Sequence, residues 1–211
     1  MQTIGFIGLG AMGTPMAWNL DEAGYDLLVY NRSDDPTEPF AEAGIDVAES
    51  PRDVGQRADI VVTMVTDDEA LAAVLDGETG LLAGIESGTT VVQMSTVTPE
   101  ATEAAAQTVR AQNARFVDAP VSGTVGPAKA GTLTVLAGGD TEVIDDVEEI
   151  LAAMGEPVVR CGDAGDGARM KLFVNLLLGD MMGAYAEALT FGAAQGLDLA
   201  AKTCVVVRIS S

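Results

Sequence analysis

Short apolar runs alternate, over the first three quarters of the chain, with segments whose apolar residues recur every three or four positions. The runs show little polar alternation, which is typical of strands covered on both faces of a sheet, and the other segments have the period of helices. We predict strands at 3–7, 27–30, 59–65, 89–94, 115–117, 132–137 and 157–160, and helices such as 12–23 and 101–111. Strands separated by helices indicate an α/β fold of the Rossmann type, with a doubly wound, mostly parallel sheet.

The pattern changes after residue 161. Residues 166 to about 195 are apolar at nearly every position around a helix, and about 30 residues rising 1.5 Å each would extend about 45 Å. We interpret this segment as a long helix that leads out of the first domain. The chain thus divides into a domain at 1–161 and, at 162–211, the long helix with the start of an all-helical C-terminal domain.

Acidic residues dominate the charged positions. The chain holds 32 Asp and Glu against 11 Lys and Arg, a net charge of −21, which repels nucleic-acid phosphates and anionic membranes. Nucleic acid is therefore not an expected partner. Acids spread over the predicted surface, with lysine only at Lys129, Lys171 and Lys202, are typical of the solvated acidic shell of proteins from high-salt cells, so we hypothesise a halophilic protein.

Cysteine and histidine usage excludes several kinds of site. Cys161 and Cys204 lack metal-ligand spacing and the chain contains no histidine, so neither a zinc site nor a Cys/His pair is expected. The N-terminus lacks the basic start of a signal peptide, and the apolar run at 172–179 is far shorter than the roughly 20 residues of a membrane span. We expect a cytoplasmic protein with no metal and no membrane partner.

The first predicted strand runs into a glycine-rich turn that opens a helix. In its GxGxxG spacing, Gly8 permits the tight turn, Gly10 lets the backbone approach a pyrophosphate, and Gly13 allows the helix to pack closely on the strand. The amide groups at the helix start then face the phosphates. We predict that a dinucleotide binds the residues of this turn, Gly8, Leu9, Gly10, Ala11, Met12 and Gly13. The alternative is a glycine-rich turn without a ligand.

The second strand is followed by Asn31, Arg32 and Ser33, where an acid would accept the ribose 2′-hydroxyl of NAD. A guanidinium at this point can hold a 2′-phosphate through paired, charged hydrogen bonds. We therefore predict NADP(H), with these three residues at the ribose. NAD remains the alternative if Asp34 or Asp35 binds the ribose and Arg32 is a solvated surface residue or covers the adenine.

Two further groups are candidates for chemistry. Ser122, Gly123 and Thr124 follow a strand end and offer two hydroxyls and an open amide to a carboxylate. Lys171 and Asn175 form an i, i+4 pair on the long apolar helix. Desolvation can keep such a lysine partly neutral and suited to proton transfer, or the lysine can simply form an ion pair with an acid.

These segments together resemble the β-hydroxyacid dehydrogenase family, which includes 3-hydroxyisobutyrate dehydrogenase and tartronate semialdehyde reductase and is related to 6-phosphogluconate dehydrogenase. The resemblance covers residues 1 to about 198 and rests on five segments in family order, namely GFIGLGAMG at 5–13, MST at 94–96, DAPVSG at 118–123, the glycine-flanked segment at 131–139, and GARMK at 167–171 with Asn175.

The resemblance implies hydride transfer between NADP(H) and a small 3-hydroxy acid or its semialdehyde. Lys171 would be the acid/base, and Asn175 would orient the substrate or the lysine. The substrate carboxylate would be held by Ser122, Gly123 and Thr124, and the nicotinamide and its ribose would be lined by Met64, Val65 and Thr96.

The sequence departs from the family in two places. Thr124 replaces a glycine, which adds a side chain beside the substrate carboxylate. The family continues into a helical domain that closes the site and forms a dimer, whereas this chain ends in a β-branched tail at 203–211. We interpret this as a truncation or frame change near residue 200, expect a homodimer through the long helix, and keep a catalytically impaired, dinucleotide-binding sensing or interaction module as the alternative function.

Overall fold

The computed structural model of the chain describes residues 2–197. Over that range nine strands form one sheet in the order β3-β2-β1-β4-β5-β6-β8-β7, with β9 paired to β8. The strands are β1 (Thr3–Ile7), β2 (Asp26–Tyr30), β3 (Asp46–Val47), β4 (Ile60–Thr63), β5 (Thr90–Gln93), β6 (Arg115–Asp118), β7 (Val121–Ser122), β8 (Thr134–Gly139) and β9 (Val158–Gly162). All pairs are parallel except those of β8 with β6 and β7.

The predicted α/β fold with a mostly parallel sheet and a long helix is confirmed, and each predicted strand is present. The strands β3 and β7 were not predicted, because two residues carry too little alternation to be recognised. The predicted strand at 59–65 is shorter in the structure, since β4 ends at Thr63 and leaves the next two residues in a loop.

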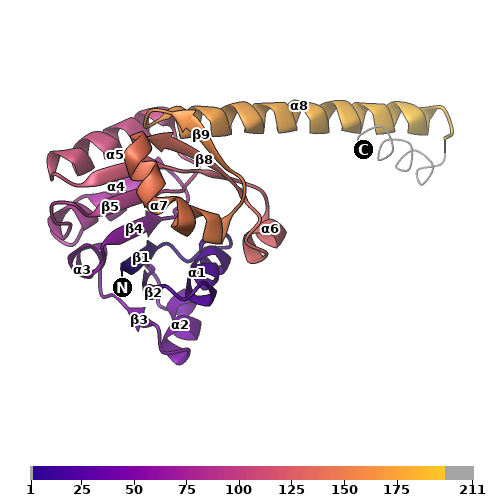
Figure 1. Cartoon of the computed structure of the whole chain (residues 1–211). Helices are drawn as coiled ribbons and strands as arrows, with labels where there is room; N and C mark the ends of the chain where they lie inside the picture. The colour runs from indigo at the N-terminus through magenta and orange to yellow at the C-terminus, as the bar shows by residue number, and fades with distance from the viewer. Residues whose placement is uncertain (1, 198–211) are drawn as a thin grey trace. The chain divides into compact units, whose positions relative to one another are not determined.

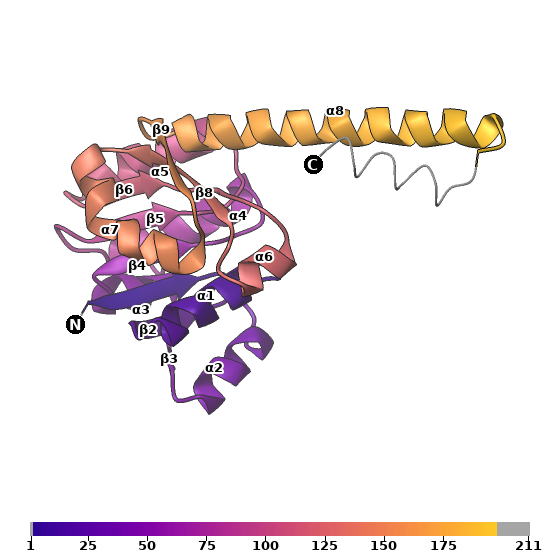
Figure 2. The same cartoon turned by 45° about the vertical axis from the view of Figure 1, so that its right-hand side comes forward.

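Helices cover both faces of the sheet (Figures 1 and 2). The helices of the described residues are α1 (Gly13–Glu22), α2 (Glu38–Glu42), α3 (Pro51–Arg57), α4 (Asp68–Leu75), α5 (Pro99–Ala111), α6 (Val125–Lys129), α7 (Thr141–Met154) and α8 (Asp166–Ala194), with short 3-10 turns η1 (Asp35–Thr37) and η2 (Leu81–Ala83). Those that cover the sheet belong to the first unit, before α8. One apolar core holds Leu20 of α1 and Leu151 of α7, and the other holds Val54 of α3 and Val109 of α5. A strand layer between two helix layers explains why its residues lack polar alternation.

Side-chain hydrogen bonds cap the N-termini of three helices, α3, α4 and α5, which all contribute to the core that holds Val54 and Val109. The Asp67 carboxylate accepts the Ala70 amide at 2.8 Å at the start of α4, and the Thr98 hydroxyl accepts the Ala101 amide at 3.2 Å at the start of α5. Ser50 caps α3 in the same way. By contrast α1, which follows the glycine turn, has Met12 as its N-cap residue and no side-chain cap. No side chain therefore competes with a ligand for the Gly13 amide at the start of α1, whereas the Thr14 amide donates to the Gly10 carbonyl at 3.0 Å and Pro15 has no amide hydrogen.

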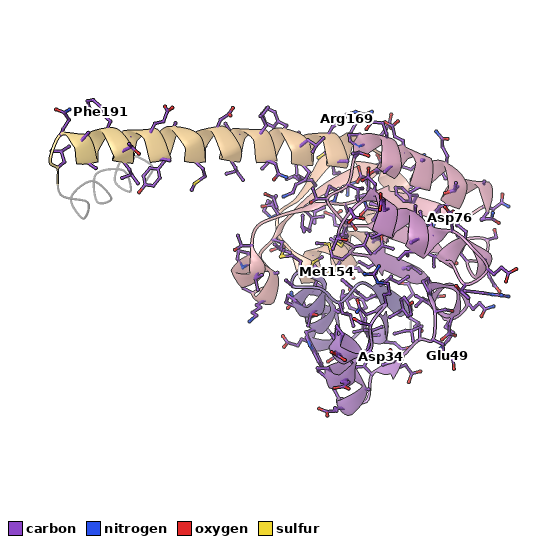
Figure 3. All side chains as sticks on the ribbon, turned by 180° about the vertical axis from the view of Figure 1, so that it is seen from behind. Asp34, Glu49, Asp76, Met154, Arg169 and Phe191 are labelled. Atoms are coloured by element: carbon purple, nitrogen blue, oxygen red, sulfur yellow. The ribbon has the colours of Figure 1, made fainter. Side chains whose placement is uncertain are left out.

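Contacts along the chain define two compact units that meet within α8, one ending at Lys171 and one starting at Leu172. The domain boundary that we predicted after residue 161 stays a prediction. In the second unit the large apolar side chains of α8 are exposed, among them Leu176 and Phe191. Phe191 is labelled in Figure 3. Lys202 and the tail at 203–211, which includes Cys204, lie outside the described residues.

Within residues 2–197, α8 is long and apolar enough to span a membrane, since an 18-residue window of it has a mean hydropathy of 1.3. One such helix is weak evidence for a membrane span, because the core helix of a soluble protein can have the same length and composition. The absence of a membrane partner therefore stays a prediction.

Candidate active site

The glycine turn between β1 and α1 tolerates no side chain at two of its three glycines. Gly8 has a φ of +102°, and a Cβ there would lie 2.2 Å from the carbonyl oxygen of Met64. A Cβ on Gly13 would lie 1.9 Å from the Gly8 carbonyl oxygen. Gly10 differs, since a Cβ on it would meet nothing within 4 Å and would point into open space. Gly8 and Gly13 are thus required by the fold, and Gly10 leaves room beside the backbone for a ligand.

The loop after β2 is tied to this turn by hydrogen bonds. The Leu9 amide donates to Asn31 Oδ1 at 3.0 Å, and Asn31 Nδ2 donates to the carbonyl and hydroxyl oxygens of Ser33, each at 3.0 Å. The Gly8 amide donates to the Tyr30 carbonyl at 2.9 Å. Two of the predicted cofactor segments, which are about twenty residues apart in the chain, therefore meet at the carboxyl edge of the sheet.

Arg32 is exposed beside this turn. Its charge reaches Asp67, whose pKa is held below the usual range first by the Ala70 amide and further by Arg32. Asp34 and Asp35 are also exposed, so both of the alternatives for binding the ribose remain open.

The loops after β4 and β5 are joined by Ser95. Its buried hydroxyl accepts the Val65 amide at 2.8 Å, and its carbonyl accepts Nε2 of the buried Gln93 at 3.3 Å. The Met64 amide donates to the Ile7 carbonyl at 2.8 Å, which places this loop beside β1. Thr96 follows Ser95 and is exposed. The three residues predicted at the nicotinamide thus lie on adjacent loops that Ser95 holds together, a residue that the sequence analysis placed only within a motif.

The predicted carboxylate turn lies between β7 and α6. Ser122 ends β7, and Gly123 has a φ of +146° with its missing Cβ only 2.6 Å from Leu133 Cδ2. The adjoining helix is bound to the cofactor helix, since Asn19 Nδ2 on α1 donates to the Ala128 carbonyl at 2.8 Å. Thr124 is exposed and precedes α6. The turn is therefore fixed relative to α1.

Lys171 is the last residue of the first unit and is only 9% exposed. Burial lowers the pKa of its amine. Among residues 2–197 no carboxylate lies within 4.0 Å of its Nζ. Of our two alternatives, this geometry favours the desolvated lysine over the ion pair. Asn175 follows one helical turn later, in the second unit, where it is exposed.

Asp118 is a residue of this region that the sequence analysis placed only within a motif. It ends β6, is 0% exposed, and its Oδ2 accepts the backbone amides of Gly165 at 3.0 Å and Ala168 at 2.9 Å. Burial raises its pKa to about 6, although these amides oppose the shift. The signal in the sequence is an acid at the end of an otherwise apolar buried strand.

The parallel sheet and the glycine turn define a nicotinamide-dinucleotide-binding domain. A sequence profile of the NAD binding domain of 6-phosphogluconate dehydrogenase matches residues 3–162. With its named relatives, this match shows that the chain belongs to the β-hydroxyacid dehydrogenase family. The resemblance inferred from the sequence is confirmed, as is the nicotinamide cofactor class.

Three similar proteins illustrate the relationship. The mitochondrial 3-hydroxyisobutyrate dehydrogenase of Mus musculus is 40% identical over 195 residues, which are 92% of this chain and 58% of that protein. An NAD-dependent L-serine dehydrogenase of Pseudomonas aeruginosa is 38% identical over 94% of this chain and 66% of its own length. The structure of Mycobacterium tuberculosis 3-hydroxyisobutyrate dehydrogenase with L-serine has a TM-score of 0.88 and 31% identity, covering 94% of this chain and 67% of that one. The chain thus spans less than two thirds of the two curated relatives.

Proposed function

We propose that this chain forms the dinucleotide-binding part of an oxidoreductase that transfers a hydride between NADP(H) and a small 3-hydroxy acid or its semialdehyde, with Lys171 as general acid/base. The observation that carries the proposal is the buried Lys171 amine, which has no carboxylate within 4.0 Å among residues 2–197 and whose pKa burial lowers. An amine with a lowered pKa is a better proton acceptor and donor near neutral pH than a solvated lysine.

The described residues fit the cofactor that the family implies. Gly10 leaves open space beside the backbone, and α1 starts without a side-chain cap, so the Gly13 amide at its start suits a pyrophosphate. The bound nicotinamide would supply or accept the hydride. Lys171 would take the proton from the substrate hydroxyl on oxidation and return it on reduction, so that hydride and proton leave or arrive together.

The substrate class follows from the turn at Ser122 and Gly123 and from the relatives. A hydroxyl and an open backbone amide suit a carboxylate. The names of the mouse and Pseudomonas relatives specify 3-hydroxyisobutyrate and L-serine, and both of these are acids with a hydroxyl on the β-carbon. Thr124 adds a β-branched side chain beside this turn, and we propose that it narrows the pocket toward small acids. Asn175 would orient the substrate or the lysine.

We propose NADP(H) over NAD(H) because the exposed Arg32 can bind a 2′-phosphate. Replacing it in Arg32→Ser is expected to weaken NADPH binding about tenfold or more, which is about 1.4 kcal/mol, with little effect on NADH. Fluorescence titration of both cofactors measures this, with Arg52→Ser, an exposed arginine of α3, as the matched control. A wild-type preference for NADH would contradict the assignment and favour Asp34 or Asp35 at the ribose.

The test of the whole proposal combines binding and turnover. NADPH fluorescence is titrated first, and a panel of short semialdehyde acids is then assayed with wild type, Lys171→Ala and Lys129→Ala, an exposed lysine at the end of α6. We expect turnover that only the Lys171 variant loses, by about a hundredfold or more. Tight NADPH binding without any turnover would favour the sensing or interaction module, because every predicted cofactor residue lies in the first unit.

We further propose a homodimer through α8, whose large apolar side chains are exposed in the second unit. Light scattering at micromolar concentration tests this, and a strictly monomeric protein would refute it. A cytoplasmic location and the absence of nucleic-acid partners stay predictions.

A further inference from the structure

We propose that Asp118 is a positioning residue, which acts on Lys171 by holding the first turn of α8 against the end of β6. This inference rests on the proposed role of Lys171. It identifies a residue that does not touch the reacting atoms but determines where the amine lies.

The contact is formed by one carboxylate oxygen and two backbone amides. Oδ2 of Asp118 accepts the amides of Gly165 and Ala168, which stand just before and within the first turn of α8. Lys171 follows Ala168 by three residues, less than one helical turn and about 4.5 Å along the axis. Because Ala168 and Lys171 belong to the same helix, a shift of this first turn carries Lys171 with it. Both hydrogen bonds go to the same oxygen, so an asparagine of the same shape can accept both.

Close backbone packing makes the contact specific. A Cβ on Gly167 would lie 2.4 Å from the Leu136 carbonyl oxygen and 2.9 Å from Asp118 Oδ2. A Cβ on Gly138 in β8 would lie 2.5 Å from the Asp163 carbonyl oxygen. The two glycines let the start of α8 approach the sheet closely enough for the Asp118 carboxylate to reach its amides.

The same carboxylate also stands at the start of the substrate turn. Asp118 ends β6, and Ser122 follows four residues later. The neighbouring Ala119 amide donates to the Gln93 carbonyl at 2.7 Å, which fixes this stretch to β5. One side chain therefore joins the strand that leads to the proposed carboxylate turn and the helix that carries the proposed acid/base.

A second set of contacts also holds the start of α8, but it is exposed and weaker than the buried Asp118 contact. Arg169, labelled in Figure 3, forms an ion pair with Glu103 of α5 and another with Asp166 at 3.0 Å, and all three side chains are exposed by 39% or more. Exposed ion pairs contribute little to stability, because water and salt screen the two charges. The Glu103 pair therefore provides a matched control for the buried Asp118 contact.

The experiment measures the titration of Lys171 itself in the whole chain. The labelling of Lys171 by trace acetic anhydride is followed against pH by mass spectrometry, with the exposed Lys129 as internal reference, in wild type, Asp118→Ala, Asp118→Asn and Glu103→Gln. We expect the midpoint for Lys171 to rise in Asp118→Ala, because the freed helix start lets water reach the amine. We expect it to stay at the wild-type value in Asp118→Asn and in Glu103→Gln. An unchanged midpoint in a folded Asp118→Ala protein would overturn the proposal.

A measurement on wild type covers the case in which Asp118→Ala does not fold. Hydrogen exchange should be slowed at the amides of Gly165 and Ala168 by about a hundredfold or more relative to an unstructured peptide. Unprotected amides at both positions would also overturn the proposal. Neither readout requires turnover, so an inactive chain would count against the proposed function and leave this inference to be decided by its own data.

Discussion

The hydroxyl of Ser95 accepts a hydrogen bond from the Val65 amide at 2.8 Å and thereby joins the loops that follow β4 and β5. Ser95 is fully buried, and Gln93 beside it bonds to its backbone on both sides, from Nε2 to the carbonyl and from the amide to Oε1. These loops carry Met64, Val65 and Thr96, the residues proposed at the nicotinamide. A buried polar network thus determines the spacing of two loops whose own side chains are partly exposed.

Replacing this hydroxyl in Ser95→Ala is expected to lower the free energy of unfolding by about 1–3 kcal/mol, because the Val65 amide loses its acceptor. Dinucleotide affinity should fall by about tenfold as the two loops separate. Denaturant unfolding and NADPH titration measure the two effects. The control is Thr108→Ala, whose hydroxyl bonds only to carbonyls of its own helix. Unchanged affinity in Ser95→Ala would show that the loops are held by other contacts.

Substitutions in the glycine turn are expected to separate an effect on cofactor binding from an effect on the stability of the fold. Gly10→Ala should leave the free energy of unfolding within about 0.5 kcal/mol of wild type, since its Cβ meets nothing within 4 Å. It should weaken dinucleotide binding at least tenfold, because the methyl group occupies the approach of the pyrophosphate. Gly13→Ala, whose Cβ would clash with the Gly8 carbonyl at 1.9 Å, should destabilise the fold by more than about 3 kcal/mol. Normal NADPH affinity in Gly10→Ala would place the phosphates elsewhere.

Asp118 should make stability depend on pH. Burial raises its pKa from 3.8 to about 6, so the folded chain holds the proton more tightly than the unfolded chain. The stabilisation from this proton is therefore complete below about pH 4 and lost as pH rises through about 6. A shift of about two units corresponds to about 3 kcal/mol.

The measurement is the free energy of unfolding of wild type minus that of Asp118→Asn, taken from pH 4 to 7.5. Subtraction removes the titration of the other acids, which the two proteins share. The difference should fall by about 3 kcal/mol as pH rises. A difference that does not vary with pH would mean that the carboxyl titrates at its ordinary value.

The net charge of −21 should make the fold sensitive to salt. Five arginines, Arg57, Arg110, Arg115, Arg160 and Arg169, form ion pairs with acids, and the excess acids repel one another until salt screens them. We expect Tm to rise by about 5 °C or more, roughly 2 kcal/mol, between low and molar NaCl. A Tm that does not move would contradict the halophilic hypothesis.

Much of the fold follows from local pattern. The buried strand β4 and the long helix α8 lack polar alternation, because each is apolar on more than one side, and that pattern is visible without any tertiary contact. The GxGxxG spacing is also a local pattern, and the close contact that requires glycine at position 13 is made with the Gly8 carbonyl of the same turn. The clash that a Cβ on Gly8 would make with the Met64 carbonyl, by contrast, depends on the neighbouring strand. The family resemblance depends on the same short segments.

The sequence by itself therefore determined the α/β class, the glycine turn and the candidate lysine, because neighbouring residues specify each of them. Only the tertiary structure decided that Lys171 is buried away from acids, that Ser95 joins two loops, and that Asp118 reaches the amide of Ala168 fifty residues later. Such contacts depend on which strands pair and how closely α8 approaches β8. No spacing along the chain encodes that distance, because it results from the packing of many side chains at once.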